Sequence, residues 1–162
     1  MLGDRTHYSP PGYRVFFSTP FPGQGHNGGT AIIVRNDIPF VPVELHSQLQ
    51  AVAVKVFIGN FYTVCSLCLS PGVPVARADL DALALGLPAP FLLLGDFNGR
   101  HPLWCDSGVV DSRGTLLASF IEDEGLEVFN SGDVTHFHSQ ILHLLTFLYI
   151  HLTAFLILIG VF

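Results

Sequence analysis

The sequence predicts a mixed fold in which strands and helices alternate, an α/β or α+β sandwich. Three features lead to this prediction: β-rich runs in the first 70 residues, a short apolar strand that ends in Gly-Asp-Phe-Asn, and two segments with helical periodicity. The chain has 162 residues, which suits one domain, and it is 49% hydrophobic. Only 12% of its residues are charged, against about 25% in a typical globular domain, so intrinsic disorder is not expected.

Strands are predicted where β-branched and aromatic residues lie between glycine-, proline- and asparagine-rich breaks. Two runs are joined by Gly59-Asn60, and a two-residue link of this kind is typical of a β-hairpin. Both runs are almost continuously apolar, which indicates that both faces of these strands are covered. The predicted strands of this half are Tyr13–Phe17, Thr30–Arg35, Ala51–Ile58 and Phe61–Leu69.

Helices are predicted where apolar residues recur three and four positions apart. Val75–Leu87 is bounded by Pro74 and Pro88, and Ser112–Glu124 has Asp111 or Ser112 as a possible N-cap and Gly125 after its end. Short strands are expected after each helix. These are Phe91–Leu94 and Leu126–Phe129.

The last 22 residues, 141–162, are uncharged and strongly apolar. A run of about 20 such residues is long enough to cross a bilayer, so the sequence predicts an apolar C-terminal helix and a possible membrane partner. The expected division is therefore a domain over residues 1–140 and a candidate transmembrane tail over residues 141–162. The polar N-terminus gives no sign of a signal peptide.

The charge distribution does not resemble that of a typical nucleic-acid binder. The net charge is −6, and the seven basic residues are scattered along the chain. Tight binding to nucleic acid usually depends on a clustered basic surface, although metal ions can also neutralise phosphate charge. Of the three cysteines, Cys65 and Cys68 are three positions apart in a predicted strand and should face opposite sides. We therefore expect core thiols in preference to a zinc or redox site.

The strongest chemical signal is Gly95-Asp96-Phe97-Asn98-Gly99, which follows the apolar strand Phe91–Leu94. A carboxylate and a carboxamide two positions apart project from one rim of a sheet. Asp96 is suited to binding a hard metal ion or accepting a proton from water, and Asn98 to donating hydrogen bonds to a developing oxyanion. The alternative interpretation is a turn in which both side chains cap local backbone groups.

The stretch from Phe91 to Asn130 resembles the endonuclease domain of LINE-type non-LTR retrotransposons, in the endonuclease/exonuclease/phosphatase superfamily. The features that carry the resemblance occur in the same order: GDFN, then His-Pro-Leu-Trp, then a D-x-R-G helix start, then a Gly-Leu strand. Weaker similarity extends over roughly residues 8–140. The resemblance implies a partial four-layer α/β/β/α sandwich and an Mg²⁺-dependent enzyme that hydrolyses phosphodiester bonds in DNA.

The resemblance also implies roles for individual residues. Asp96 would orient or deprotonate the attacking water and serve as a metal ligand, and Asn98 would stabilise the transition state. Thr135 matches a threonine near the DNA-contacting rim, and His101 matches a histidine that follows GDFN; both are therefore candidate substrate-binding residues.

Three departures from the family pattern predict that this chain is inactive. Met1 falls after the segment that carries the family's metal-binding glutamate, so that ligand is expected to be absent and the domain truncated at both ends. Cys68 occupies the place of a tyrosine. After Gln140, the acidic final strand of the family is replaced by the apolar run. The alternatives to an active endonuclease are thus a non-catalytic remnant and a small tail-anchored membrane protein.

Overall fold

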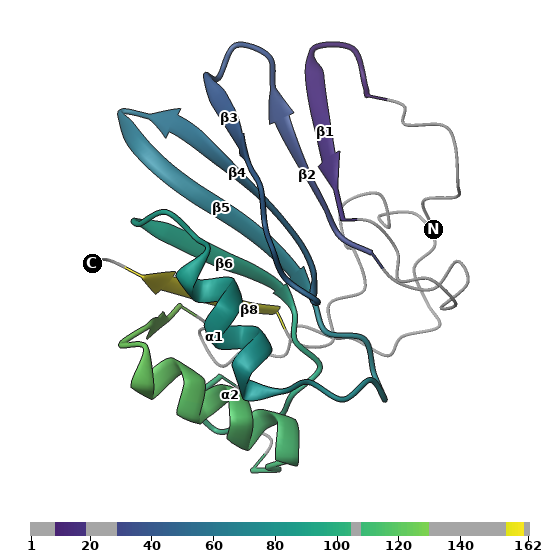
Figure 1. Ribbon diagram of the computed structural model, residues 1–162, viewed down its shortest axis with the longest axis vertical. Helices are drawn as coiled ribbons and strands as arrows, with labels where there is room; N and C mark the ends of the chain where they lie inside the picture. Colours follow the sequence, from purple (N-terminus) through teal and green to yellow (C-terminus); the bar gives the residue numbers. More distant parts are fainter. Residues whose placement is uncertain (1–8, 19–28, 105–107, 130–154, 161–162) are drawn as a thin grey trace.

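The computed structural model describes residues 9–18, 29–104, 108–129 and 155–160, and these form two sheets and two helices (Figure 1). A two-stranded sheet pairs β1 with β2, and a six-stranded sheet has the order β3-β4-β5-β6-β8-β7. In chain order the elements are β1 (Tyr13–Phe17), β2 (Ala31–Arg35), β3 (Phe40–Val43), β4 (Gln50–Ile58), β5 (Asn60–Cys68), α1 (Arg77–Leu85), β6 (Phe91–Asp96), α2 (Ser112–Asp123), β7 (Glu127–Val128) and β8 (Phe155–Gly160).

The pairing of β5 with β6 determines where the polar residues of the large sheet gather. The β3, β4 and β5 strands are antiparallel, whereas β5 and β6 are parallel and are connected through α1. A parallel pair needs a crossover connection of this kind. The carboxyl ends of β5 and β6 therefore lie at the same edge of the sheet, where Cys68 is paired with Asp96.

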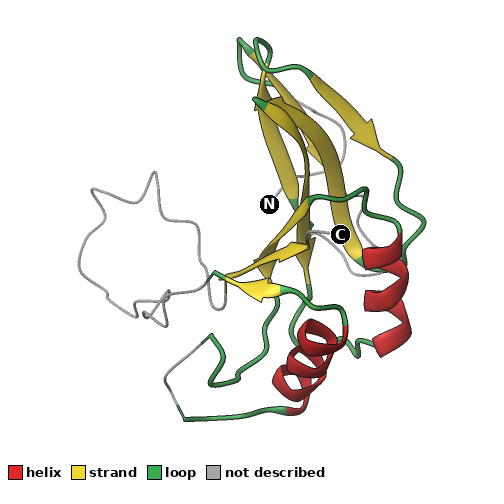
Figure 2. Ribbon diagram, turned by 90° about the vertical axis from the view of Figure 1, so that its left-hand side faces the viewer, coloured by secondary structure: helices red, strands yellow, loops and turns green. Residues whose placement is uncertain are grey.

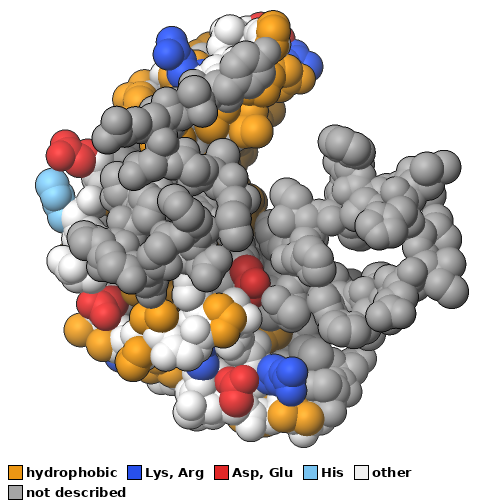
Figure 3. All heavy atoms as spheres, turned by 90° about the vertical axis from the view of Figure 1, so that its right-hand side faces the viewer, with side chains coloured by type: hydrophobic (Ala, Val, Ile, Leu, Met, Phe, Trp, Pro, Cys, Tyr) orange, Lys and Arg blue, Asp and Glu red, His pale blue; other side chains and the backbone are white. Residues whose placement is uncertain are grey.

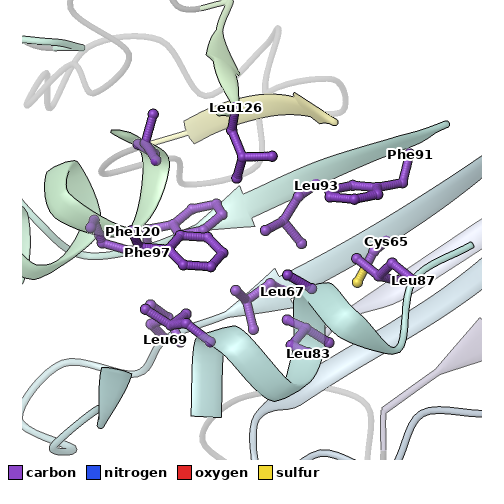
Figure 4. Packing of buried hydrophobic residues seen from close by; sticks show 14 of the residues in the cluster. Cys65, Leu67, Leu69, Leu83, Leu87, Phe91, Leu93, Phe97, Phe120 and Leu126 are labelled. Atoms are coloured by element: carbon purple, nitrogen blue, oxygen red, sulfur yellow. The ribbon is translucent and has the colours of Figure 1, made fainter. Parts of the chain in front are cut away.

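The main hydrophobic core lies between the large sheet and the two helices. Strand residues such as Leu67 and Leu93 point toward Leu83 of α1 and Phe120 of α2, and Figure 4 shows these side chains meeting from both sides. Each of the four is at most 1% exposed. The apolar stripes predicted for both helices are thus the faces that pack on the sheet.

The opposite face of the large sheet is partly covered by the β1–β2 sheet. A second, smaller cluster is formed by Val34 of β2 with Val54 and Val56 of β4. The described residues are therefore layered as helices, large sheet and small sheet, with both helices on one side of the large sheet (Figure 2). This confirms the predicted mixed sandwich.

Most of the predicted elements are confirmed, with small shifts at their ends. The hairpin is tighter than expected, because Ile58 pairs with Asn60 around Gly59, which has a φ of 74°. The strand that precedes GDFN continues to Asp96. The β3 strand was not predicted, because it has only four residues and contains Pro42. Proline is tolerated there since β3 is an edge strand of the large sheet.

The expected C-terminal helix is wrong for residues 155–160. These residues form β8, which lies between β6 and β7 and pairs antiparallel with both. A continuous apolar run is compatible with a buried strand as well as with a helix, and periodicity alone does not separate the two. Within the described ranges, no helix has the length and hydrophobicity required to span a membrane. Residues 141–154, and with them the predicted boundary after residue 140, lie outside these ranges.

Candidate active site

The candidate site lies at the carboxyl ends of β5 and β6. Asp96 is the last residue of β6 and is half-buried, and its sheet partner is Cys68, which in turn is paired with Gln50 at the start of β4. Strand alternation places all three on the face that also carries Val54, on the side of the β1–β2 sheet. Ligands of open sheets that contain parallel strands commonly bind beyond the carboxyl ends of those strands.

Gly95 allows β5 and β6 to approach closely at this edge. Its φ is 149°, and a Cβ added to it would lie 1.8 Å from the backbone oxygen of Leu67. A side chain would therefore separate the two strands directly beside Asp96. The glycine before the carboxylate is needed for packing of the backbone, whatever its relation to a ligand.

Asp96 and Asn98 are held together in one turn. The backbone N–H of Asn98 donates to Oδ1 of Asp96 at 3.1 Å, and Asn98 has a φ of 47°, which is uncommon for a residue with a side chain. The Nδ2 of Asn98 donates to the backbone oxygen of Leu69 at 3.1 Å, and the N–H of Leu69 donates to the backbone oxygen of Asp96 at 2.9 Å. Asp96 therefore caps a local backbone group, as the turn interpretation predicted, whereas the Asn98 side chain binds a segment 29 positions away. These bonds do not exhaust the site, because the carboxamide of Asn98 has a second N–H beside the one that binds Leu69.

The guanidinium of Arg113 connects this turn to the segment after β5. Arg113 is the second residue of α2 and is half-buried. Its Nη1 donates to the backbone oxygen of Leu69 at 3.0 Å and makes longer bonds of 3.5 Å and 3.4 Å to those of Phe97 and Asn98. Its Nη2 donates to two further backbone oxygens, those of Ser70 at 3.1 Å and Val73 at 2.6 Å.

The start of α2 is fixed to the residues after GDFN by short contacts. Asp111 is the N-cap, and its carboxylate accepts hydrogen bonds from the backbone N–H groups of Gly114 at 2.6 Å and Arg100 at 3.2 Å. A Cβ added to Gly114 would lie only 1.9 Å from the backbone oxygen of Arg100. The indole N–H of buried Trp104 donates to the backbone oxygen of Gly99 at 2.9 Å. The loop after the candidate site is therefore anchored to the helix at several points.

The thiol of Cys68 faces the same edge and is kept neutral. Burial and the negative charge of Asp96 raise the pKa of Cys68, against the opposing effects of hydrogen bonds from Ser70 and the backbone of Gly29 and of the positive charge of Arg113. Cys65 lies in the main core on the other face, and burial raises its pKa to about 12. The expectation that the two cysteines face opposite sides is borne out by this placement.

A pocket of about 230 Å³ adjoins Cys68, between the start of β4 and the segment that leads into α1. Gln50 lies in its wall with only 3% of its surface exposed, and its Oε1 accepts hydrogen bonds from the N–H of Gly29 at 3.2 Å and the hydroxyl of Ser70 at 3.5 Å. Basic side chains on the face drawn in Figure 3 are dispersed, as the sequence indicates. Attraction of a polyanion to this face would thus depend on few charges.

The other predicted site residues are not brought to this turn by any contact among the described residues. His101 packs against Trp104, with ring centroids 5.2 Å apart, and its Nδ1 accepts the backbone N–H of Leu103 at 3.3 Å. Thr135 lies outside the described residues. Substrate binding by these two residues stays a prediction.

The described residues supply few metal ligands. Across these ranges, no three His, Cys, Asp or Glu side chains lie close enough together to hold a metal ion. A site in which Asp96 supplies one carboxylate is still compatible with Mg²⁺, which commonly binds through one or two carboxylates together with phosphate oxygens and water. A neutral thiol such as Cys68 is a poor ligand for so hard a cation.

Two residues of this edge were not singled out as functional candidates from the sequence. Arg113 was counted among the scattered basic residues, and Gln50 carried no motif. The D-x-R-G pattern was a signal for Arg113. Its partners, however, are up to 44 positions away in the sequence, so its hydrogen bonds could not be derived from local spacing.

The fold and the edge just described place the chain in a definite class of architecture. It has the fold of a retrotransposon endonuclease domain. The solved structure that carries this comparison is the endonuclease domain of TRAS1, a telomere-specific non-LTR retrotransposon. The match has a TM-score of 0.66 and 23% sequence identity, and it covers 91% of this chain and 64% of that chain. The expected resemblance to such domains is confirmed.

Sequence comparison leads in the same direction. The chain is 27% identical over 114 residues to the probable RNA-directed DNA polymerase from transposon BS of Drosophila melanogaster. The aligned part is 68% of this chain and 12% of that protein, so the chain spans a small share of the relative's length. No family model matches the chain.

Proposed function

We propose that this chain carries part of the phosphodiester-cleaving site of a metal-dependent DNA endonuclease of the retrotransposon type. The observation that carries the proposal is the rigid turn that joins Asp96 to Asn98 at the carboxyl end of β6. The resemblance in fold and sequence supports DNA as the substrate. We further propose that the described residues do not complete the site and that the chain hydrolyses DNA very slowly or not at all.

The roles follow from the chemistry of the two side chains. The carboxylate of Asp96 would hold Mg²⁺ and accept a proton from the attacking water. The bound ion would supply charge neutralisation at the phosphate. One N–H of the Asn98 carboxamide is engaged with Leu69, which fixes the plane of the amide, and the second N–H would donate to a phosphate oxygen.

The proposed inactivity rests on the number of charged groups. Phosphoryl transfer depends almost wholly on positioning and on charge stabilisation. The described residues offer no cluster of three metal-ligating side chains at Asp96 or elsewhere, so they provide little of either. Residues that act as a unit lose most of their effect when partners are missing.

A paramagnetic titration tests the site. We expect Mn²⁺, added in place of Mg²⁺ to the isotopically labelled chain, to broaden the NMR signals of residues 95–99 first. The same titration of Asp96→Asn should leave these signals sharp, and Glu122→Gln, which changes an exposed carboxylate on α2, should behave like the parent chain. Broadening that is equal in Asp96→Asn and the parent would contradict the proposed site.

A nicking assay tests the proposed inactivity. Supercoiled plasmid incubated with the purified chain and Mg²⁺ or Mn²⁺ should be nicked no faster than with Asp96→Ala. Mg²⁺-dependent nicking by the parent that Asp96→Ala abolishes would show that the chain cleaves DNA through Asp96. That result would overturn the second part of the proposal and retain the first.

A further inference from the structure

We propose that Arg113 is a positioning residue that sets the orientation of the Asn98 carboxamide. This inference deepens the proposed function, because it concerns the same edge, but it makes a structural claim that is testable without catalysis. Its basis is the fork of hydrogen bonds from one guanidinium to the two backbone segments that meet there.

The location of Arg113 in α2 is unfavourable for the helix itself. A positive charge in the first turn opposes the helix dipole, which favours anions at the N-terminus. The first turn of α2 contains no acidic residue, and the capping carboxylate of Asp111 precedes it. A local cost of this kind is expected where the side chain has another role, and here the guanidinium points away to backbone oxygens of the sheet edge.

The oxygen of Leu69 is the shared acceptor that couples Arg113 to Asn98. It accepts the Nδ2–H of Asn98 at 3.1 Å and the Nη1–H of Arg113 at 3.0 Å. The second nitrogen, Nη2, binds the oxygens of Ser70 and Val73 and so holds the segment that carries Leu69. Without the guanidinium, Leu69 is still held by its N–H bond to Asp96 and by the core, but the Ser70–Val73 segment that follows it loses its anchor. We expect the acceptor of the Asn98 amide to be less firmly placed as a result.

A lysine is not equivalent at this position. The planar guanidinium presents five N–H donors in a rigid fork, whereas an ammonium is a single point with three donors. The acceptors of Arg113 belong to two segments: Nη1 binds the oxygens of Leu69 and Asn98, one on each segment, and Nη2 binds those of Ser70 and Val73. Retention of the charge by Arg113→Lys should therefore not restore the arrangement.

The test compares three variants by NMR of the Asn98 side-chain amide. We expect Arg113→Ala and Arg113→Lys to shift both Asn98 amide proton signals and to accelerate their exchange with solvent. Arg100→Ala is the matched control, because Arg100 is an exposed residue of the adjoining loop and its loss removes the same charge. Its spectrum should match that of the parent chain in the Asn98 amide region.

Chemical rescue separates positioning from a general loss of structure. Guanidinium at millimolar concentration, far below denaturing levels, should return the Asn98 signals of Arg113→Ala toward the parent positions, and ammonium should not. Unmoved Asn98 signals in Arg113→Ala, full restoration by Arg113→Lys, or equal disturbance in Arg100→Ala would each overturn the inference.

A metal titration links the inference to the site without making one depend on the other. If the parent chain binds Mn²⁺ at Asp96 and the Asn98 signals respond to Arg113→Ala, both proposals are supported. If the parent chain does not bind Mn²⁺ at Asp96 but the Asn98 signals respond as expected, the proposed function fails and the role of Arg113 stands. If Mn²⁺ binds and the signals do not respond, the inference fails alone.

Discussion

Replacing Gly114 with alanine should destabilise the protein, although general helix propensity predicts the opposite. Gly114 lies in the first turn of α2, and alanine is favoured over glycine inside a helix by about 1 kcal/mol. In this fold the added Cβ would lie 1.9 Å from the backbone oxygen of Arg100 and 2.5 Å from its carbonyl carbon. The two effects have opposite signs, so their magnitudes decide the outcome.

The steric effect is the larger one. Ordinary contact begins near 3.4 Å, so the methyl group and the Arg100 carbonyl must separate by about 1.5 Å. Neither Gly114 nor Arg100 is able to move away easily, because the carboxylate of Asp111 accepts hydrogen bonds from the backbone N–H groups of both residues. Overpacking of this kind costs typically 1–3 kcal/mol, and weakening of the N-cap adds about 1 kcal/mol. After the gain in propensity is subtracted, we expect Gly114→Ala to lower the free energy of unfolding by about 2 kcal/mol.

Urea denaturation followed by tryptophan fluorescence measures this directly. Trp104 is the only tryptophan, it is 4% exposed, and its indole is bonded to Gly99 beside the affected contact. Gly125→Ala is the control: Gly125 has a φ of 60° and open space around its Cβ position, so only backbone strain of about 1 kcal/mol is expected there. A Gly114→Ala variant that is as stable as the parent, or more stable, would refute the close contact between α2 and the loop.

Three further changes should alter stability in defined directions. Asp111→Ala removes the acceptor of the Gly114 and Arg100 N–H groups and should lower the free energy of unfolding by about 1–2 kcal/mol in urea denaturation, with an unchanged midpoint contradicting the cap. Thr63→Val should raise the free energy of unfolding by about 1 kcal/mol, because the Thr63 hydroxyl is buried and has no hydrogen-bond partner among the described residues. A lower free energy of unfolding in this variant would indicate that the hydroxyl does form a hydrogen bond. Burial raises the pKa of Cys65 from 9.0 to about 12. The neutral thiol therefore stabilises the folded state fully below pH 9, and the free energy of unfolding falls by about 1.4 kcal/mol per pH unit as the pH rises toward 12. Urea midpoints measured from pH 8 to pH 11 should therefore fall less steeply in Cys65→Ala than in the parent.

Local patterns in the sequence were sufficient for most of the described fold. Tyr13–Phe17 was predicted with the bounds that β1 has, and Ser112–Glu124 differs from α2 by one residue at its end. These segments show a clear period and clear caps, so each one indicates its own structure. The order of these elements predicted a sandwich, and the resemblance to retrotransposon endonuclease domains added the α/β/β/α layering, which no single segment determines.

The failures have a common physical cause. Residues 155–160 have the composition of a membrane helix, yet they pair with Phe91–Asp96, and the paired residues are 59 to 69 positions apart in the chain. The β3 strand is likewise formed because β4 is available as a partner. Partners that are distant in sequence determine these elements, and hydropathy within the segment contains no information about such partners.

The same distinction applies to the candidate site. Asp96 and Asn98 are two positions apart, so the sequence was sufficient to place them together. The segment after β5 that completes the edge is about 30 positions away from them. Arg113, at the start of α2, donates a hydrogen bond to the same segment. A motif therefore identified the candidate catalytic pair, whereas the groups that fix their orientation became apparent only in the folded chain.

Stability and site geometry are coupled at this edge because they use the same atoms. The backbone oxygen of Leu69 accepts hydrogen bonds from both Asn98 and Arg113. Phe97, the residue before Asn98, is buried in the main core. A variant that loses Mn²⁺ binding is informative about chemistry only if its free energy of unfolding is unchanged. Asp96→Asn meets this condition best, since it keeps the size of the side chain and an oxygen that is able to accept the N–H of Asn98. Substitution of Asn98 would instead disturb both properties, because its φ of 47° suits asparagine and glycine better than most residues.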